Sequence, residues 1–527
     1  MVTLRSLQPV VRPGDVYHES QRVAIIDMGT NSWRVIVVEY VPGLSFKLID
    51  EVQESVRIGE GMAELNVLRP AAMDRAARAA QIFAAFCTAS GISDIVAVGT
   101  SAIRDAQNQA RFLQRIEKES GLKVRVLSGE EEAYYGYLAA VNSTTVENGF
   151  VMDLGGGSLQ ITRVEGRKSV RSISFPLGVV RLTEGFLFSD PVTSKETSAL
   201  TDALRERLKS LDWFAYEDGM QLIGEGGNVR LVARLQQKRV EYPLDLIHGY
   251  EMHSKEVAEV CDVLARATVA QRRRIDGMKP ERADISLAGA LVLQGVMRAG
   301  GFERVAFSGQ GVREGLFYER FFADEGPDRP PIFADVRQSN VLNLGHVYRF
   351  QEAHARHITH LTTRMFDQLP PNSHNLRPQE REVLWAASML HDIGMAIDYN
   401  DHHRHGSYLV LNSGLPGYTH REIALIALLI RYHRRGKPSL DDMAALCEPK
   451  DDRRLEQMTA MLRLAEQIDR ARDGAVKDLR LTVAGGRCIM ELVTQGDEQV
   501  PLWAVERHRD LFSGAFGLPV EFVPVPA

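Results

Sequence analysis

Two short stretches of the chain share one order of apolar and polar residues. Residues 23–40 read VAIIDMGTNSWRVIVVEY, and residues 149–164 read GFVMDLGGGSLQITRV. In each stretch an apolar strand runs up to an aspartate, a turn of small residues follows, and a second β-rich strand begins. Asp27 and Asp153 occupy equivalent positions, separated by about the length of one domain. The repeat predicts two similar α/β domains that face each other across a cleft.

The remaining pattern predicts a change of architecture after the second domain. Helical stretches alternate with short apolar strands in the first part, which is typical of α/β folds. A charged, proline-rich stretch cannot continue a helix and indicates a linker. Helical periodicity then dominates, and the end of the chain returns to strand-like pieces. The predicted division is a tail 1–19, lobe I 20–146, lobe II 147–321, a linker 322–336, a helical domain 337–478 and a small α+β domain 479–527.

Composition and charge narrow the functional classes. The 527 residues are 44% hydrophobic and 25% charged, and the formal net charge of -6 argues against a general nucleic-acid binder. A polyanionic substrate stays open, because a local groove can be positive on an acidic protein. The four cysteines are far apart, which predicts free thiols in a reducing compartment. No signal peptide or apolar run of about 18 residues is present, so we expect a soluble cytoplasmic protein without membrane partners.

The turns between the paired strands are candidates for phosphate binding. Small residues let a phosphate approach converging backbone N–H groups. The aspartate before each turn, Asp27 or Asp153, suits Mg²⁺, which combines a few carboxylates with water and phosphate oxygens. The alternative is a pair of ordinary hairpins with glycine turns. The candidate phosphate-binding residues are Gly29, Thr30, Asn31 and Ser32 in the first turn, and Gly155, Gly156, Gly157 and Ser158 in the second.

The two hairpins resemble the phosphate motifs of the actin, sugar-kinase and chaperone ATPase superfold. Four further blocks narrow the resemblance to the exopolyphosphatase/guanosine pentaphosphate phosphatase (Ppx/GppA) family, over residues 23–476. These blocks are VGTSAIRDA at 98–106, SGEEEA at 128–133, FPLGVVRL at 175–182 and SGQGVREG at 308–315. The resemblance implies two actin-like, ribonuclease H-like lobes around a catalytic cleft.

The resemblance also implies roles for individual residues. Glu132, directly before the alanine of the acidic block, is expected to activate the attacking water. Arg104 is expected to face the transferred phosphate, and Arg181 to bind phosphate. Asp27 and Asp153 are expected to hold Mg²⁺. The alternatives are a solvated helix N-terminus for the acidic cluster and a surface ion pair for Arg104.

Two positions depart from the pattern of the family. Gln160 stands where the family commonly has a glutamate, so a negative charge is missing near the expected cation. Glu225, in the GEGGN block, adds an acid near the expected phosphate path.

A long polyanionic substrate also needs cationic side chains beyond the active site, and two basic runs are candidates for a basic track that binds it. These runs are Arg272, Arg273 and Arg274, and Arg431, His433, Arg434, Arg435 and Lys437.

The helical domain contains a second constellation. His354, the adjacent His391 and Asp392, and the distant Asp469 resemble the ligand order of HD-type metal-dependent phosphohydrolases. His405 and His433 fall where two-metal members add ligands. Imidazole and carboxylate together suit Mn²⁺, Fe²⁺ or Zn²⁺. The alternative is a helix bundle with hydrogen-bonded core histidines. We expect bound metal here but not the principal reaction.

These observations favour an exopolyphosphatase that releases the terminal phosphate of inorganic polyphosphate. A guanosine pentaphosphate (pppGpp) phosphohydrolase at the same site is the nearest alternative, because both substrates end in the same phosphoanhydride. A weakly catalytic alarmone sensor and a phosphotransferase are further alternatives. The resemblance also implies a homodimer.

Overall fold

The computed structural model describes residues 20–62, 66–323, 330–496 and 498–527. Its first sheet has the strand order β3-β2-β1-β4-β5, and its second has the order β10-β11-β9-β6-β7-β8. In both sheets the first strand pairs antiparallel with the next strand and parallel with a later one. The order β8-β7-β6-β9-β11 therefore repeats β3-β2-β1-β4-β5. The internal repeat predicted from the two stretches is confirmed at the level of topology.

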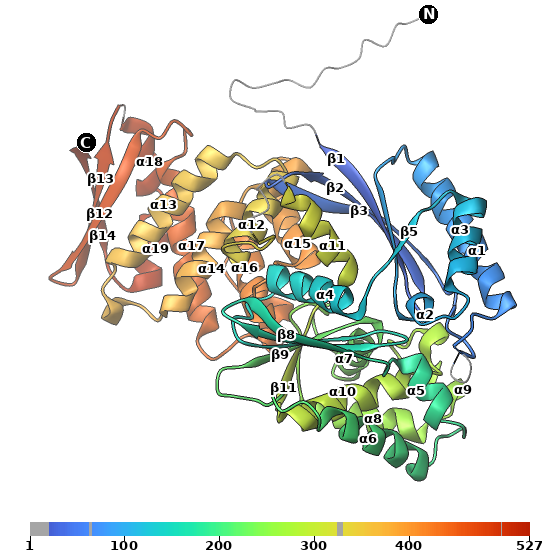
Figure 1. Cartoon of the computed structure of the whole chain (residues 1–527). Coiled ribbons are helices and arrows are strands. Elements are labelled where there is room, and N and C mark those ends of the chain that lie inside the picture. The colour runs from blue at the N-terminus through green and yellow to red at the C-terminus, as the bar shows by residue number, and fades with distance from the viewer. Residues whose placement is uncertain (1–19, 63–65, 324–329, 497) are drawn as a thin grey trace, which may run out of the picture.

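Lobe I carries the first sheet, drawn in blue at the right of Figure 1. Helices α1 and α3 pack together on one of its faces. Its elements are β1 (Gln21–Met28), β2 (Trp33–Val41), β3 (Ser45–Glu54), α1 (Pro70–Ala89), β4 (Ile95–Gly99), α2 (Ser101–Arg104), α3 (Gln109–Ser120), β5 (Val124–Val126) and α4 (Gly129–Ser143).

Lobe II carries the second sheet, with helices α6, α8 and α10 below it in Figure 1. Its strands are β6 (Gly149–Leu154), β7 (Leu159–Glu165), β8 (Lys168–Phe175), β9 (Gln221–Glu225), β10 (Glu251–His253) and β11 (Arg304–Phe307). Its helices are α5 (Val179–Phe186), α6 (Ser194–Leu208), α7 (Gly227–Arg239), α8 (Ser254–Arg266), α9 (Val269–Arg272), η1 (Pro280–Arg282), α10 (Ser286–Gly300) and α11 (Val312–Phe321).

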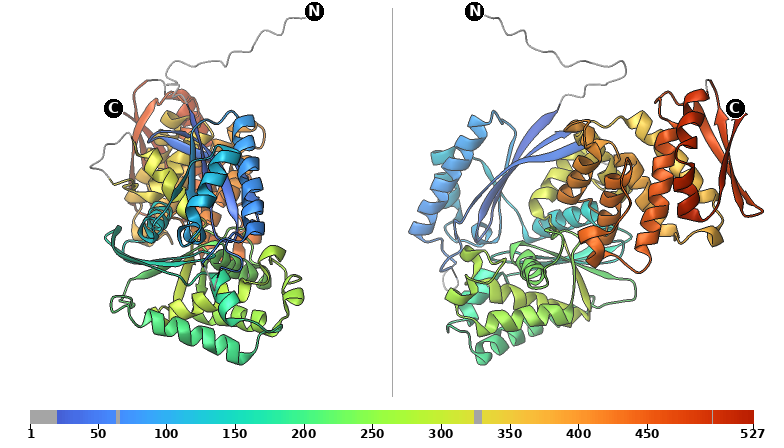
Figure 2. Two further views of the ribbon diagram at one scale, coloured as in Figure 1. Left: turned by 45° about the vertical axis from the view of Figure 1, so that its right-hand side comes forward. Right: turned by 180° about the vertical axis from the view of Figure 1, so that it is seen from behind.

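The C-terminal part is a helical region followed by a three-stranded sheet, and the right-hand view of Figure 2 shows this sheet at the far end from lobe I. The helical elements are α12 (Val336–Val347), α13 (Glu352–Gln368), η3 (Pro371–Ser373), α14 (Pro378–Leu390), η4 (Ile393–Ala396), α15 (His402–Ser413), α16 (His420–Tyr432), η5 (Asp441–Leu446) and α17 (Asp451–Ile468). The last elements are β12 (Val476–Ala484), β13 (Arg487–Thr494), α18 (Gln499–Glu506), α19 (Arg509–Phe516) and β14 (Val520–Pro526).

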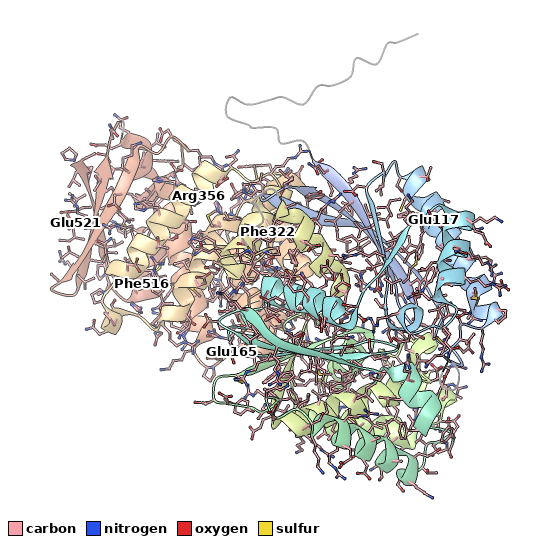
Figure 3. All side chains as sticks on the ribbon, viewed as in Figure 1. Glu117, Glu165, Phe322, Arg356, Phe516 and Glu521 are labelled. Carbon is pink, nitrogen blue, oxygen red and sulfur yellow. The ribbon has the colours of Figure 1, made fainter. Side chains whose placement is uncertain are left out.

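Helices α4 and α11 lie between the two sheets and position the cleft. Helix α4 packs on α11 and on β6, β7 and β8, and α11 packs back on β1. An aromatic cluster extends this contact toward α12: the rings of Phe46 and Phe321 lie 5.2 Å apart, and those of Phe322 and Phe333 lie 5.0 Å apart. Figure 3 labels Phe322 near the middle of the molecule. Lobe I, α11 and the start of the helical region are thus joined by one apolar core.

The predicted change of architecture after the second lobe is confirmed: the elements from α12 to α17 are all helical, and β12 begins a three-stranded sheet. The predicted tail 1–19 and residues 324–329 of the predicted linker lie outside the described residues. Of the helices that the structure describes, none is long and apolar enough to cross a membrane.

Candidate active site

The turns after β1 and β6 meet in space, although they are far apart in the chain. A Cβ built on Gly157 would lie 2.7 Å from Thr30 Oγ1 and 2.5 Å from Ser101 Oγ. A Cβ on Gly156 would lie 3.1 Å from the Asn31 nitrogen. Only glycine permits this approach, because any side chain would displace the opposite turn. The structure therefore brings the two predicted phosphate-binding turns together.

Glu132 faces these turns from the first helical turn of α4. Ser128 caps the helix: its hydroxyl accepts from Glu131 N at 3.1 Å, and the Glu131 carboxylate accepts from Ser128 N at 2.8 Å. Glu130 is exposed, whereas Glu132 is 6% exposed. Ser158 Oγ lies 3.4 Å from Glu132 Oε1. Glu132 thus lies in the cleft, whereas Glu131 caps the helix and Glu130 is exposed.

The surroundings of Glu132 raise the pKa of its carboxyl group. Burial raises the pKa of its carboxyl, the nearby Asp153 and Asp27 raise it further, and Arg104 opposes them, with a result of about 7. Arg104 Nη1 donates to Glu132 Oε2 at 2.8 Å and to the Leu127 carbonyl at 3.0 Å. A carboxyl with such a pKa is suited to accept a proton near neutral pH.

Asp153 lies at the centre of a row of three polar side chains on neighbouring strands. In the β6 ladders, its Cα partner is Gln160 on β7 and Glu225 on β9, so all three side chains share one face of the sheet. Gln160 donates to Ser158 Oγ at 2.9 Å and to Ser174 Oγ at 3.0 Å. The amide that replaces the expected glutamate therefore holds Ser158 in place.

Glu225 is fully buried beside Asp153. A Cβ on Gly136 of α4 would lie 3.3 Å from Glu225 Oε2 and 3.8 Å from Asp153 Oδ2, so both carboxylates point toward α4. Neither oxygen of Glu225 has a hydrogen-bond partner among the described residues. The nearby Ser308 hydroxyl is engaged with the Gln310 backbone. Burial and the charge of Asp153 raise the pKa of Glu225.

The carboxylates of the cleft fit a divalent cation. Asp27 Oδ1 and both Glu225 oxygens are buried polar atoms without a protein partner in the part of the chain that the structure describes. Burial raises the pKa of Asp27, and burial raises the pKa of Asp153 to about 6. Carboxylate oxygens with water and phosphate oxygens are the ligands that Mg²⁺ prefers. Glu225, which departs from the sequence pattern of the family, thus belongs to this carboxylate group.

The other predicted phosphate-binding residues differ in their burial and in their hydrogen-bond partners. Arg181 Nη2 bonds to Asp105 Oδ2 at 2.5 Å, which joins lobe II to lobe I next to Arg104. Asn31 is buried, and its Oδ1 has no partner within the described ranges. Its carbonyl accepts from Arg57 N at 2.8 Å. Ser32 is partly buried at the end of the first turn.

The predicted basic track is wrong in two of its members. Arg272 is 1% exposed and donates to the Leu264 carbonyl at 2.7 Å, and His433 is 2% exposed inside the helical region. Arg435 is exposed but paired with Asp401. The cations that do surround the cleft were missed, because they are scattered along the chain: Arg34, Arg230, Lys279, Arg282 and Arg313.

The helical region collects the second predicted constellation. Two groups of described residues bring three ligand atoms to within 4.8 Å of one another: His354, His391 and Asp392, and Asp392, His402 and His433. Asp392 belongs to both groups. His354 Nδ1 lies 2.7 Å from Asp469 Oδ2. Four predicted ligands, His354, His391, Asp392 and His433, therefore converge, whereas Asp469 reaches the cluster only through His354.

His405, the remaining predicted ligand, takes no part in either group. His402, the first residue of α15, stands there instead, with its Nε2 3.1 Å from His433 Nε2 and 3.3 Å from Asp392 Oδ1. Glu466 also belongs to the cluster, although the ligand order in the sequence does not include it: its Oε2 lies 3.2 Å from Nε2 of His354 and from Nε2 of His391. Its helical spacing of three residues from Asp469, which puts both on one helix face, was the available signal.

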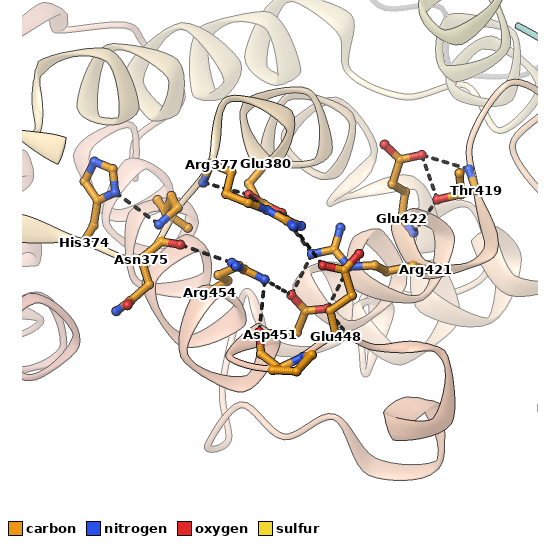
Figure 4. A network of polar contacts seen from close by, with 12 residues as sticks. His374, Asn375, Arg377, Glu380, Thr419, Arg421, Glu422, Glu448, Asp451 and Arg454 are labelled. Atoms are coloured by element: carbon orange, nitrogen blue, oxygen red, sulfur yellow. Dashed lines mark hydrogen bonds and ion pairs between the residues drawn. The ribbon is translucent and has the colours of Figure 1, made fainter. Parts of the chain in front are cut away.

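Three helix ends point at this cluster. His391, His433 and Asp469 are the C-cap residues of α14, α16 and α17. At the opposite ends of the same helices, Arg421 Nη2 bonds to Asp451 Oδ1 at 2.6 Å and to Glu380 Oε1 at 2.9 Å, a network that Figure 4 shows. The network holds the helices parallel. Their C-terminal ends carry partial negative charge, which favours a cation at the cluster.

The pKa of one histidine of the cluster is raised, and that of another is lowered. Burial disfavours the charged form of His391, but Asp392 and Glu466 prevail and raise its pKa to about 9. Burial and His391 lower the pKa of His433 to about 3. Only a neutral imidazole can bind a metal ion, so a cation bound here would displace the proton of His391. Neutral imidazoles beside three carboxylates are a donor set that fits Mn²⁺, Fe²⁺ or Zn²⁺.

Two repeated lobes with facing phosphate turns and a buried carboxylate group define an actin-like, ribonuclease H-like fold, as the sequence predicted. The model of the Ppx/GppA phosphatase family matches residues 36–322, and the model of domain III of these phosphatases matches residues 336–500. The chain belongs to the Ppx/GppA phosphatase family, whose members hydrolyse phosphoanhydrides.

Individual relatives are similar over different parts of the chain. A guanosine-5'-triphosphate,3'-diphosphate pyrophosphatase of Vibrio vulnificus is 26% identical over 495 residues, which is 92% of this chain and 94% of the relative. The crystal structure of an Aquifex aeolicus Ppx/GppA family member is 27% identical with a TM-score of 0.51, and covers 58% of this chain and 100% of that one. An exopolyphosphatase from Cytophaga hutchinsonii, 24% identical with a TM-score of 0.53, covers 57% of this chain and 98% of its own, and supports the fold.

Proposed function

We propose that the chain is an exopolyphosphatase that hydrolyses the terminal phosphoanhydride of inorganic polyphosphate. The observation that carries the proposal is the position of Glu132: buried, 3.4 Å from Ser158, and facing the place where the turns after β1 and β6 meet. Hydrolysis of a phosphoanhydride needs positioning, charge neutralisation and a directed water. The cleft offers a group for each task.

The residues divide the work as follows. Backbone N–H groups of the two turns hold the terminal phosphoryl group, and the Ser158 hydroxyl contacts it. Glu132 accepts a proton from the attacking water. Arg104 keeps the Glu132 carboxylate oriented and opposes the rise of its pKa. Asp27, Asp153 and Glu225 would hold the divalent cation, and that cation would neutralise charge on the transferred group.

A phosphate-release assay tests the substrate. Polyphosphate and pppGpp are offered at equal concentration, and kcat/KM is measured for each. We expect at least a tenfold preference for polyphosphate, which corresponds to about 1.4 kcal/mol of transition-state discrimination. A tenfold preference for the nucleotide would replace the exopolyphosphatase proposal by its nearest alternative.

That alternative, a pppGpp 5'-phosphohydrolase, is favoured by the Vibrio vulnificus relative, whose similarity covers 92% of this chain. Tight binding without phosphate release, unaffected in Glu132→Gln, would instead favour an alarmone sensor. Phosphate found on an acceptor would favour a phosphotransferase. A homodimer remains a prediction.

For the helical region we propose bound metal at the cluster of His354, His391, Asp392, His402 and His433. The convergence of two three-ligand groups on Asp392 supports this proposal. Metal analysis of the purified chain tests it, and a content below 0.2 equivalents after growth with Mn²⁺, Fe²⁺ and Zn²⁺ would contradict it. The principal hydrolysis stays in the cleft between the lobes.

A further inference from the structure

The C-terminal end of α4 is held by side chains from other elements. Helix α4 carries Glu132 in its first turn and ends at Ser143, so about 16 Å of helix separates the two residues. The last carbonyl groups of a helix have no partner inside it. The Val141 carbonyl accepts from Arg167 Nη2 at 2.9 Å. The Ser143 carbonyl lies 2.8 Å from Nε2 of His248, so a lobe II histidine anchors the far end of the helix that carries Glu132.

Both ring nitrogens of His248 have a partner, and these partners fix its tautomer. The backbone N–H of Gly309 donates to Nδ1 at 3.0 Å, so Nδ1 carries no proton. Nε2 therefore carries the proton and donates to the Ser143 carbonyl. Burial lowers the pKa of His248 to about 4, so the ring is neutral at neutral pH. The imidazole thus joins the end of α4 to the loop that precedes α11.

The backbone of His248 is bound in turn by the helical region. His420, the first residue of α16, is 5% exposed, and its Nε2 lies 3.0 Å from the His248 carbonyl. Because a carbonyl only accepts, Nε2 of His420 donates, and its Nδ1 accepts from the Tyr242 hydroxyl at 2.9 Å. One chain of hydrogen bonds therefore runs from the helical region through His248 to the end of α4.

The position of α4 decides where Glu132 lies in the cleft. Packing on α11 fixes the distance between the two helices closely, since a Cβ on Gly315 of α11 would lie 2.0 Å from the Tyr135 carbonyl of α4. A polar contact at the end of a helix restrains its shift along the axis, and the regular helix transmits such a shift from Ser143 to Glu132. A displacement of about 1 Å at a reacting group can lower a rate by about 10²-fold.

We propose that His248 is a positioning residue for Glu132. Its Nε2–H fixes the end of α4, and its carbonyl ties that end to His420. This inference rests on the proposed function, because the effect on hydrolysis passes through Glu132. Hydrogen bonds behind a catalytic group keep it aligned. The helical region thus contributes to hydrolysis in the cleft through α16, independently of its own metal cluster.

Steady-state hydrolysis by the full chain tests this role with two amide variants, on whichever of polyphosphate and pppGpp the parent hydrolyses faster. His248→Gln places a donor near the position of Nε2 and retains the bond to Ser143, whereas His248→Asn retains only an acceptor for Gly309. His248→Asn should lower kcat by tenfold or more with KM within twofold of the parent. His248→Gln should keep kcat within threefold of the parent. His360→Asn, which removes a 3.0 Å contact with Asp478 in the helical region, is the control and should change neither constant.

The two amides distinguish positioning from a general loss of stability. The assays are run well below the Tm of every variant, so a lower Tm alone does not reduce kcat. Values of kcat within twofold of each other in His248→Asn and His248→Gln would overturn the role, and so would a change in KM alone in His248→Asn. If His248→Asn does not fold, the pair His420→Leu and His420→Gln carries the same criteria, because only the glutamine keeps a donor for the His248 carbonyl.

Glu132→Gln, measured in the same assay, separates this inference from the proposed function. A large fall in kcat for Glu132→Gln beside an unchanged His248→Asn overturns the positioning role alone. An unchanged kcat in Glu132→Gln overturns the assignment of Glu132 and the role of His248 with it. The double variant should be within threefold of Glu132→Gln, because both changes act through one group. A further tenfold fall in the double variant would show that His248 acts independently of Glu132, which contradicts the inference.

Discussion

Glu132 Oε1 and Ser158 Oγ lie 3.4 Å apart, although the two residues belong to different lobes. Glu132 lies on α4, which packs against β6, β7 and β8. Ser158 is the last residue of the turn after β6. The acid and the phosphate turn are therefore held by the same sheet. Variants of this cleft give direct tests of the assigned roles.

Replacement of Arg104 by Met should shift the pH dependence of hydrolysis. Arg104 opposes the rise of the Glu132 pKa, so its loss raises that pKa and protonates the base at a given pH. The acid limb of the kcat/KM profile should move to higher pH by at least half a unit. Arg115→Met, which removes a lobe I arginine that pairs with Asp74 and Glu119 on the surface, should leave the limb in place. If the acid limb of the kcat/KM profile does not move in Arg104→Met, Arg104 does not control the pKa of Glu132.

Glu225→Gln should stabilise the metal-free protein and reduce the additional stabilisation that Mg²⁺ gives. In EDTA the variant loses a buried carboxylate without a partner, so its Tm at pH 8 should rise. In 5 mM Mg²⁺ it loses a cation ligand, so the Tm gain on adding Mg²⁺ should shrink. Differential scanning calorimetry measures both. Equal Mg²⁺-induced gains in variant and parent would exclude Glu225 from the cation site.

In the metal-free protein, the stability that Asp153 and Glu132 contribute should be lost as the pH rises from about 5 to about 8. The folded-state pKa values of Asp153 and Glu132 are raised, to about 6 and about 7, so their contribution is fully present below the unfolded values near 4. It is lost as the pH passes through the folded values. Denaturant unfolding of the parent and of the Asp153→Asn/Glu132→Gln variant in EDTA across this range checks the sign. The free energy of unfolding of the parent should fall relative to that of the variant as the pH rises, and a relative rise would contradict the assignment.

Asp392→Asn should reduce the metal content of the helical region without stopping phosphate release. Asp392 joins both ligand groups, so its amide weakens both at once. Elemental analysis should show a loss of at least half of the bound transition metal. Hydrolysis of polyphosphate should stay within threefold of the parent. Asp398→Asn, an exposed neighbour, should retain the metal. Full metal content in Asp392→Asn would contradict the proposed ligand set.

Local signals in the sequence predicted much of this architecture. The duplicated hairpins predicted the two sheets, and the family blocks placed Glu132 and Arg104 in one site. The cleft cations were not predictable in this way, because Arg34, Arg230 and Arg282 come from three separate elements and meet only in the folded chain. Glu225 appeared as an anomaly, since only strand register shows that it stands beside Asp153.

The helical region shows the same limit at a finer scale. The pair His391–Asp392 was predictable because its members are adjacent. The choice of His402 over His405 depends on the direction in which α15 enters the cluster. Similarly, Arg272 belongs to a basic run that suggested a surface track, but the chain turns this side chain inward onto the Leu264 carbonyl. The amino-acid composition of a segment does not show which way its side chains point in the fold.

Phosphate release by Glu132→Gln tests the central claim most directly. The amide keeps the size of the side chain but cannot accept the proton of water, so kcat on polyphosphate should fall by about 10²-fold or more. Polyphosphate affinity and the Mg²⁺-dependent gain in Tm should persist, which shows that the cleft is intact. A kcat within fivefold of the parent would contradict the assignment of Glu132 as the group that activates the attacking water.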